Sequence, residues 1–482
     1  MIDFARVLES HLVEQMAADE IARQERMRAA WKAYHGDMPK PLKVAAGQPD
    51  DNVIVAKART IVDASVAMMF GGGITFNVGE EGDGSPEDEY LSDVWKANKQ
   101  PTWLAKLATN GAVCGHVFVK IVEPQPPRQP LPRLLVLDPA NVRVRYQDDD
   151  IEQVYEYINT WNSIDERGKP VLHRQRTILQ DNGLWLVVDE EARPSEYVQL
   201  WREVGRRVWP YQWPPMLDCQ NLPLPNVYYG EPDLTPDVVA LVRSLNFTLS
   251  NWARIIKWYA NPRQYVTGVS SGATLDVAAD KTLMLPTGAT LGLLQINSDL
   301  AGTAEFARRL EEAVHELTAT LAIATGKLES VGALSGVALQ VLYAPLTAKT
   351  EKKRGLYGDL LEEICKRVLD LGGYGYENDV DVTWPETTPQ DAKAEAETLA
   401  IHKTLGVSTD TILDKLGYDA ATEQENKQGE MDAEAEVGDR MLAAFERGQN
   451  AMRMNGGANG QEAATGPQGQ MDAADGGRMG TA

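Results

Sequence analysis

The chain has 482 residues, more than one ordinary hydrophobic core accommodates, so we expect several lobes. Its hydrophobic content of 43% and charged content of 24% are those of a folded soluble protein, and no apolar run is long enough to span a bilayer. A net charge of −23 argues against a tight, sequence-reading DNA-binding protein, which presents a basic face, but it suits a surface along which DNA slides without being held.

The N-terminal part is predicted to be largely helical. We expect a first helix over residues 1–35, whose acidic start without an apolar segment argues against a secretory signal. The apolar stripe in VIVAKARTIVDASVAMMF predicts a second helix up to Phe70. Gly71–Gly73 are interpreted as a helix stop before the strand ITFNV, because a phosphate loop would need a following Lys-Ser or Lys-Thr. Residues 90–115 predict two short helices.

The three cysteines, Cys114, Cys219 and Cys365, are far apart in the sequence. An odd and sparse set favours a reducing compartment over a disulfide framework. Cys114 and His116 alternate within a strand-like stretch, and we interpret them as packing residues rather than metal ligands.

Residues 113–208 have the alternation and frequent turn residues of a mostly antiparallel sheet. The next stretch, WPYQWPPMLDCQNLPLP, contains too many prolines for a helix. We expect its aromatic side chains to cover the sheet, with binding of a partner as the alternative.

Two long helices follow, separated by a small β insert. Thr235 as N-cap and Pro236 at the first helical position begin the first helix, which we expect to end at Asn261–Pro262. The second is predicted from about Thr303 to Thr325. An apolar stripe marks the first of them: Val238, Leu241, Val242, Leu245, Leu249, Trp252, Ile255, Ile256 and Tyr259.

Residues 328–346, LESVGALSGVALQVLYAPL, join a nearly uncharged loop to a helix that contains Pro345 and continues to about residue 371. The strand DVDVTWPE follows, then a small helical module after Pro389. From Gln449 the composition predicts disorder.

Several motifs resemble sites of chemistry but lack the required context. Ser270 lies in a G-x-S-x-G pattern, yet a hairpin turn fits better than a nucleophile between strand and helix. Lys327 ends a Walker-like stretch that lacks the following Ser or Thr. Asp148–Asp150 favour an exposed turn over an ion site. Arg206–Arg207 and Lys352–Arg354 are interpreted as solvated faces. We therefore predict no catalytic residue, no metal site and no cofactor.

The order of these elements resembles one family, the portal proteins of tailed bacteriophages, of the siphophage head-to-tail connector type. The resemblance covers about residues 1–440, and each motif is weak alone whereas their order is specific. The residues that carry it are Asn52, Lys57, Ile61, Val62, Asp63, Phe70-Gly71 and Ile74; Trp95, Asn98, Leu104–Ala108, Gly111 and Gly115; Leu137-Asp138-Pro139 and Val142; Gly230-Glu231-Pro232-Asp233-Leu234; Ser335–Leu339; and Ser408, Thr411 and Leu416-Gly417.

The resemblance implies an α+β portal fold whose parts are named wing, stem, clip, tunnel loop and crown. Carried onto this chain, it implies the following ranges: wing 1–229, first stem helix 230–261, clip 262–301, second stem helix 302–326, tunnel loop 327–335, tunnel and wing helix 336–371, wing return strand 372–386, crown 387–440, and a disordered tail 441–482.

The resemblance further implies a ring, expected to be a dodecamer, at one capsid vertex of the virion, with assembly in the host cytoplasm. Implied partners are the terminase large subunit, a head-tail adaptor, the major capsid or scaffold protein, and double-stranded DNA passing non-specifically; no membrane is implied. The implied channel-lining residues are Lys327, Leu328, Glu329, Ser330, Val331, Gly332 and Leu334. Partner docking at the clip is expected at Gln264, Val266, Lys281 and Leu283.

This resemblance gives the loop and the proline a physical role. Gly332 and Gly336 let the loop change shape at little steric cost, and its mostly neutral side chains touch DNA without gripping phosphate. Pro345 removes a backbone donor, so we expect it to kink the helix from the channel wall into the wing. We also expect neighbouring subunits to bury the stripe of the first long helix. Alternatives are a portal-like ring of a gene-transfer agent or tailocin, a serine hydrolase acting through Ser270, and a DNA-binding regulator.

Overall fold

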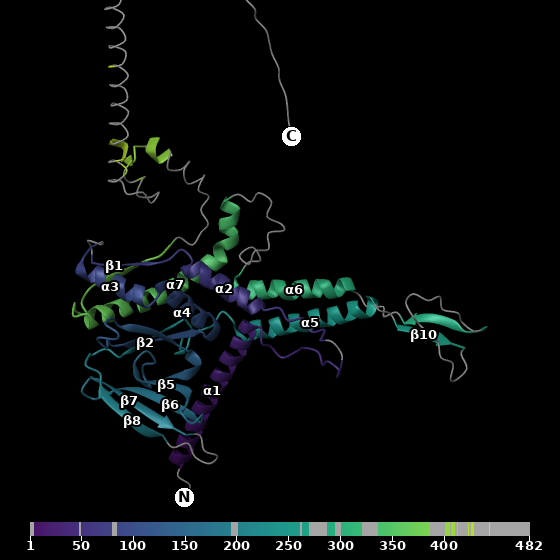
Figure 1. Ribbon diagram of the computed structural model, residues 1–482, viewed down its shortest axis with the longest axis horizontal. Helices are drawn as coiled ribbons and strands as arrows, with labels where there is room; N and C mark the ends of the chain where they lie inside the picture. Colours follow the sequence, from purple (N-terminus) through teal and green to yellow (C-terminus); the bar gives the residue numbers. More distant parts are fainter. Residues whose placement is uncertain are drawn as a thin grey trace, which may run out of the picture. The chain divides into compact units, whose positions relative to one another are not determined.

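A computed structural model of the chain describes residues 4–47, 50–79, 84–193, 201–260, 263–268, 287–294, 300–320 and 336–385, with short stretches between 401 and 443. The chain divides into two compact units, residues 1–389 and 390–482. The first unit mixes helices and sheets (Figure 1), which confirms the predicted α+β class. Within the described residues, no helix combines the length and apolarity needed to traverse a bilayer.

Four helices form the N-terminal part and are close to those predicted: α1 (Phe4–His35), α2 (Lys57–Phe70), α3 (Pro86–Ala97) and α4 (Gln100–Cys114). The chain leaves α2 at the predicted glycine stop, where Gly73 has a φ of +79°. Buried residues of α1, α2 and the end of α4 make one core with the start of a later helix, α5 (Pro236–Ala260). This core joins the N-terminal helices to the two long helices.

The predicted β region forms two antiparallel sheets. Strands β4 (Val142–Tyr146), β5 (Val154–Ile164), β6 (Pro170–Leu179), β7 (Trp185–Ala192) and β8 (Arg202–Val208) make a five-stranded meander. Strand β2 (His116–Val122) lies between β3 (Arg133–Leu137) and β9 (Met216–Gln220). A short 3₁₀ helix, η1 (Pro139–Asn141), connects β3 to β4.

The proline- and tryptophan-rich stretch confirms one expectation and adds a strand. Trp209 and Trp213 are buried in the core beneath the sheets, as predicted for aromatic covering. Strand β9 was not expected there. It pairs with β2 because its residues, Met216–Gln220, lie between Pro215 and Pro223 and include no proline, so each of them carries a backbone N–H donor.

The largest helix, α7 (Gly336–Leu371), ends in this same core, where Tyr357, Leu361 and Ile364 are fully buried. Strand β12 (Val380–Thr383) then returns to pair antiparallel with β1 (Thr75–Val78). The chain therefore closes its first unit by joining its last strand to its first.

Helices α5 and α6 (Leu300–Thr318) lie side by side, with the hairpin of β10 (Arg263–Thr267) and β11 (Thr290–Leu294) between them in sequence (Figure 1). This is the predicted order of helix, small β insert and helix. Figure 1 also shows α7 changing direction between a short first part and a long second part. Pro345 lies inside this helix.

Candidate functional site: the junction of the three long helices

A buried ion cluster joins α7 to the start of α5. The Asp233 side chain has no exposed surface and pairs with Lys353 Nζ at 2.6 Å and Lys349 Nζ at 3.0 Å. The two lysines are four residues apart on α7 and so share one face of the helix. Lys353 Nζ also donates to Ser65 Oγ of α2 at 3.0 Å, and the Asp233 backbone N–H donates to Ala112 O at 2.8 Å. Asp233 and its two lysines together therefore connect α7, α2, α4 and the segment that leads to α5.

The Asp233 carboxylate stays ionised although it is buried. Burial alone would raise the pKa of Asp233, but the two ammonium groups outweigh burial and lower the pKa well below its usual range. The pKa of Lys353 is lowered because burial outweighs its attraction to Asp233.

The interpretation of Lys352–Arg354 as a solvated face is therefore wrong for two of the three residues. Lys353 and Arg354 are buried, and only Lys352 is exposed. The reason is that α7 lies across the core, so consecutive residues of the run face different surroundings.

Helix α6 ends at this same junction. It stops at Thr318, not at the predicted Thr325, because Ala319 adopts a left-handed φ of +55° and ends the helical path. The backbone N–H groups of Ala319 and Thr320 donate to the carbonyls of Glu316 and His315. Lys349 Nζ donates to the Thr318 carbonyl at 3.1 Å. Lys349 of α7 thus contacts both the segment that leads to α5 and the end of α6.

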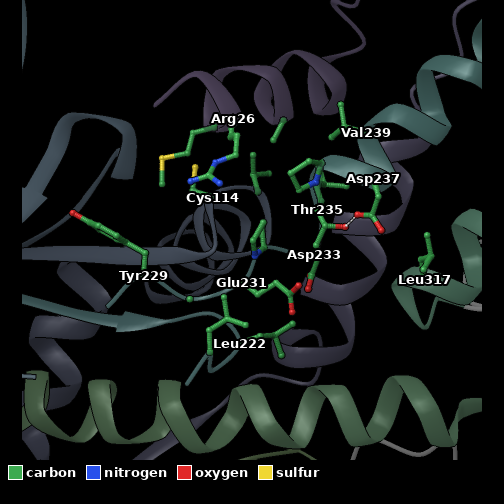
Figure 2. A pocket seen from close by; sticks show the side chains of 18 of the residues that line it. Arg26, Cys114, Leu222, Tyr229, Glu231, Asp233, Thr235, Asp237, Val239 and Leu317 are labelled. Atoms are coloured by element: carbon green, nitrogen blue, oxygen red, sulfur yellow. Dashed lines mark hydrogen bonds between the residues drawn. The ribbon is translucent and has the colours of Figure 1, made fainter. Parts of the chain in front are cut away.

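A pocket of about 1030 Å³ opens beside this junction. Figure 2 shows Cys114 and Tyr229 on one side of it and Leu317 of α6 on the other, with Asp233 and Thr235 between them. Burial raises the pKa of the Cys114 thiol, so the thiol stays protonated and unreactive. Cys114 and Tyr229 bring no nucleophile or acid-base pair to this pocket.

Two glycines of the resemblance motifs allow the close approach behind this pocket. Gly115 has a φ of +83°, and a Cβ there would lie 2.4 Å from Gly230 O. A Cβ on Gly230 would in turn lie 2.7 Å from Gly115 O. The end of α4 and the segment leading to α5 therefore touch backbone to backbone, which only glycine permits.

Gly115→Ala is expected to destabilise the protein by about 2–4 kcal/mol, the sum of a left-handed backbone and an overpacked contact. Urea unfolding followed by circular dichroism measures this. Gly168→Ala is the matched control, since Gly168 has a φ of +74° but open space around its Cβ position. Equal losses at both positions would contradict the close-approach argument.

A row of three polar side chains on α5, called here the polar ladder, binds residues 51–55 and holds them along the helix. It was not predicted from the sequence. Asn246, Ser250 and Arg254 follow one another at four-residue spacing on α5. The backbone N–H groups of Val55 and Val53 donate to Asn246 Oδ1 at 3.0 Å and Ser250 Oγ at 2.9 Å. Arg254 pairs with Asp51 through two hydrogen bonds, of 2.7 and 3.0 Å. The four-residue spacing of these polar residues within an otherwise apolar helix was the sequence signal that could have indicated such a contact.

The chain itself buries part of the apolar stripe of α5. Val238, Val242 and Leu245 are buried by the chain itself. Ile256, a member of the stripe, is 46% exposed, and outside the stripe three large apolar side chains are about half exposed: Phe247 (48%) on α5, and Phe306 (54%) and Leu317 (56%) on α6. Phe247 lies about two and a half turns after Val238 and so points away from the buried face.

The remaining predicted site residues are only partly described. Gln264 and Val266 lie on β10, where they pair with Leu293 and Leu291 of β11. Lys281 and Leu283 lie outside the described residues, as do Ser270 and the whole predicted loop of Lys327, Leu328, Glu329, Ser330, Val331, Gly332 and Leu334. Among the described residues, no three His, Cys, Asp or Glu side chains gather as a metal site would require.

Comparison with known proteins identifies the family. Residues 17–438 match the model of the phage portal protein family of the SPP1 Gp6-like type. The chain belongs to this family, whose members are structural proteins of the virion, and its function is that of a portal protein. A sequence search of curated proteins finds no significant match.

The following three are among the solved structures that are similar to the chain. One is described as the neck of a native GTA particle computed with C12 symmetry, with 13% identity, a TM-score of 0.44, and 75% of this chain and 89% of that chain covered. The virion of a native gene transfer agent particle gives 14% identity and a TM-score of 0.41 over the same shares. The neck of an empty GTA particle computed with C6 symmetry gives 13% and 0.38, again over those shares.

Proposed function

We propose that α5 and α6 are the stem of the portal ring and that each copy packs its α5 against α6 of the next copy. The observation that carries this proposal is the set of half-exposed apolar side chains on these two helices, Phe247 on α5 and Phe306 and Leu317 on α6. Phe306 and Leu317 are eleven residues apart, about three turns, so they share a face of α6. A contact between two different surfaces, repeated around a rotation axis, closes into a ring.

The other parts keep the assignments that the resemblance implies. In this proposal residues 1–229 and 372–386 are the wing, 262–301 the clip, 327–335 the tunnel loop, and 387–440 the crown. The second stem helix is shortened to end at Thr318. The ring contains about twelve copies, catalyses no reaction itself, and assembles in the host cytoplasm before it joins the virion.

The clip is proposed to dock the terminase large subunit during packaging and the head-tail adaptor afterwards. The exposed aromatic Tyr265 and the exposed Leu291 on the β10–β11 hairpin support a contact role for this segment. An isolated two-stranded hairpin is marginally stable in water, so neighbours or partners would stabilise it. Gln264, Val266, Lys281 and Leu283 remain the proposed docking residues.

Negative-stain electron microscopy of the purified chain, with light scattering for mass, tests the proposal. We expect rings with a central hole and about twelve subunits. A monodisperse monomer at micromolar concentration would contradict the assembly role of α5 and α6.

Val331→Asp is expected to impair DNA packaging while leaving ring assembly intact, because a carboxylate on the tunnel loop repels the DNA backbone. Counting DNA-filled particles and imaging the purified rings measures both effects. Val208→Asp, at an exposed position of β8, is the control and is expected to package normally. Loss of rings in Val331→Asp would show that residues 327–335 are structural and do not form the tunnel loop.

A further inference from the structure

The junction of the three long helices contains two lysines whose contacts differ. Lys353 is the more deeply buried, with 3% of its side chain exposed against 14% for Lys349. Both reach Asp233, but Lys353 adds only Ser65 of α2, whereas Lys349 adds the Thr318 carbonyl of α6. The two lysines therefore have separable roles around one carboxylate.

The contact with Thr318 fixes the C-terminus of α6. The Thr318 carbonyl belongs to the last turn of that helix, where carbonyls have no partner within the helix. A cation placed there also interacts favourably with the helix dipole. The Thr320 hydroxyl is the other donor to this carbonyl, at 3.3 Å. Lys349 thus caps α6 from a different helix.

Lys349 also marks the point where α7 becomes anchored. It lies four residues after Pro345, about one turn. Before the proline, Val341 is 69% exposed, whereas Leu346, directly after it, is 1% exposed. The first ionic contact that α7 makes with the rest of the unit, among the described residues, is therefore the one made by Lys349.

We infer that Lys349 is a positioning residue, a clamp that holds the C-terminus of α6 and the part of α7 after Pro345 to one buried carboxylate, and so fixes the two points between which residues 319–345 run. Asp233 keeps Lys353 as its partner when Lys349 lets go, so the clamp opens without leaving a buried charge unpaired. Lys353 thereby holds α7 to the segment before α5, whereas Lys349 in addition holds α7 to the end of α6. The consequence for DNA rests on the proposed function, in which residues 319–345 contain the tunnel loop.

The test is hydrogen exchange of the full-length protein, read by mass spectrometry on peptides that cover residues 312–322. In Lys349→Met we expect the amides of Ala319 and Thr320 to exchange at least about tenfold faster, because the C-terminal turn of α6 loses its cap. The thermal midpoint is expected to fall by only a few degrees, and by less than in Lys353→Met, because Asp233 keeps its more deeply buried partner. Lys352→Met, at the exposed neighbour on the same helix, should change neither quantity.

Lys353→Met distinguishes the positioning role of Lys349 from the stabilising role of Lys353. It is expected to lower the thermal midpoint of the whole first unit and to speed exchange everywhere, since it removes the deeper partner of Asp233. If Lys349→Met exchanges like Lys352→Met, or loses stability globally like Lys353→Met, the clamp is wrong. If Lys349→Met does not fold, Lys349→Gln replaces it, and its failure to fold would assign Lys349 a purely structural role and overturn the inference.

Ring formation is measured on the same samples and decides a different question. Absence of rings in the parent protein would overturn the proposed stem but leave the exchange result standing. If Lys349→Met forms normal rings but yields about tenfold fewer DNA-filled particles, Lys349 also affects the passage of DNA. If the particles fill normally, the effect of Lys349 is confined to the junction of α6 and α7.

Discussion

Replacing Asp233 by Asn is expected to lower the free energy of unfolding by roughly 3–5 kcal/mol, the cost of leaving a buried charge without its partner. The substitution keeps the size of the side chain but removes the only negative charge among the ion-pair contacts of Lys349 and Lys353. Because these contacts join α5 to α7, unfolding should begin between those helices. Urea titration followed by tryptophan fluorescence measures the loss.

Asp237→Asn is the matched control for this prediction. Asp237 is exposed, lies one turn along the same stretch and contacts only Thr235 and nearby backbone. A carboxylate at the first turn of a helix contributes about 0.5 kcal/mol. A loss at Asp233 no larger than that at Asp237 would show that the cluster does not hold the junction.

The same pair of proteins gives a signed pH dependence. The pKa of Asp233 is lowered in the folded state, so its stabilisation is complete above the unfolded value of about 3.9 and is lost as the pH falls towards the folded value. The difference in stability between the parent and Asp233→Asn should therefore be constant near neutrality and shrink below about pH 4. A difference that does not shrink there would mean that Asp233 is not the titrating group.

Phe247→Asp is expected to abolish rings while the monomer stays folded. Phe247 is half exposed in the single chain, so an aspartate there disturbs little of the monomer's core. In a ring it would place an unpaired carboxylate inside an apolar contact, which costs several kcal/mol per interface and is repeated at every interface. Light scattering and electron microscopy measure assembly, and circular dichroism measures folding.

Val204→Asp is the control for the ring prediction, because Val204 of β8 has the same exposed fraction, 48%. We expect it to leave the rings unchanged. Rings that persist in Phe247→Asp would exclude this face of α5 from the subunit contact. Loss of rings in both variants would mean that exposed apolar positions in general, and not the stem, decide assembly.

The boundaries of helices were predicted correctly where the residues that set them lie within the same short segment. The helix that begins at Thr235–Pro236 is α5, and the glycine stop after Phe70 ends α2, since caps and breakers act within a few residues. Where a boundary depends on contacts elsewhere, prediction failed. The end of α6 at Thr318 involves Lys349, thirty-one residues further along.

The residues of the candidate site also differ in how far the sequence revealed them. Asp233, Gly115 and Gly230 were noticed in the sequence because they stand in an order typical of portal proteins, but the reason for each residue was not visible there. Lys353 was placed on the surface, because three basic residues in a row have no internal sign of which one is buried. The ladder of Asn246, Ser250 and Arg254 was missed, since its partners lie almost two hundred residues earlier.

Periodicity, turn chemistry and motif order are local or cumulative signals, so the residue pattern was enough to predict the fold class, the order of helices and strands, and the resemblance to portal proteins. The folded chain was needed to show which charges are buried, which apolar side chains of α5 and α6 are exposed, and that Lys349 joins α7 to α6 and to the segment before α5. Those properties depend on what lies opposite a residue in space, and a partner distant along the chain leaves no mark on the local pattern.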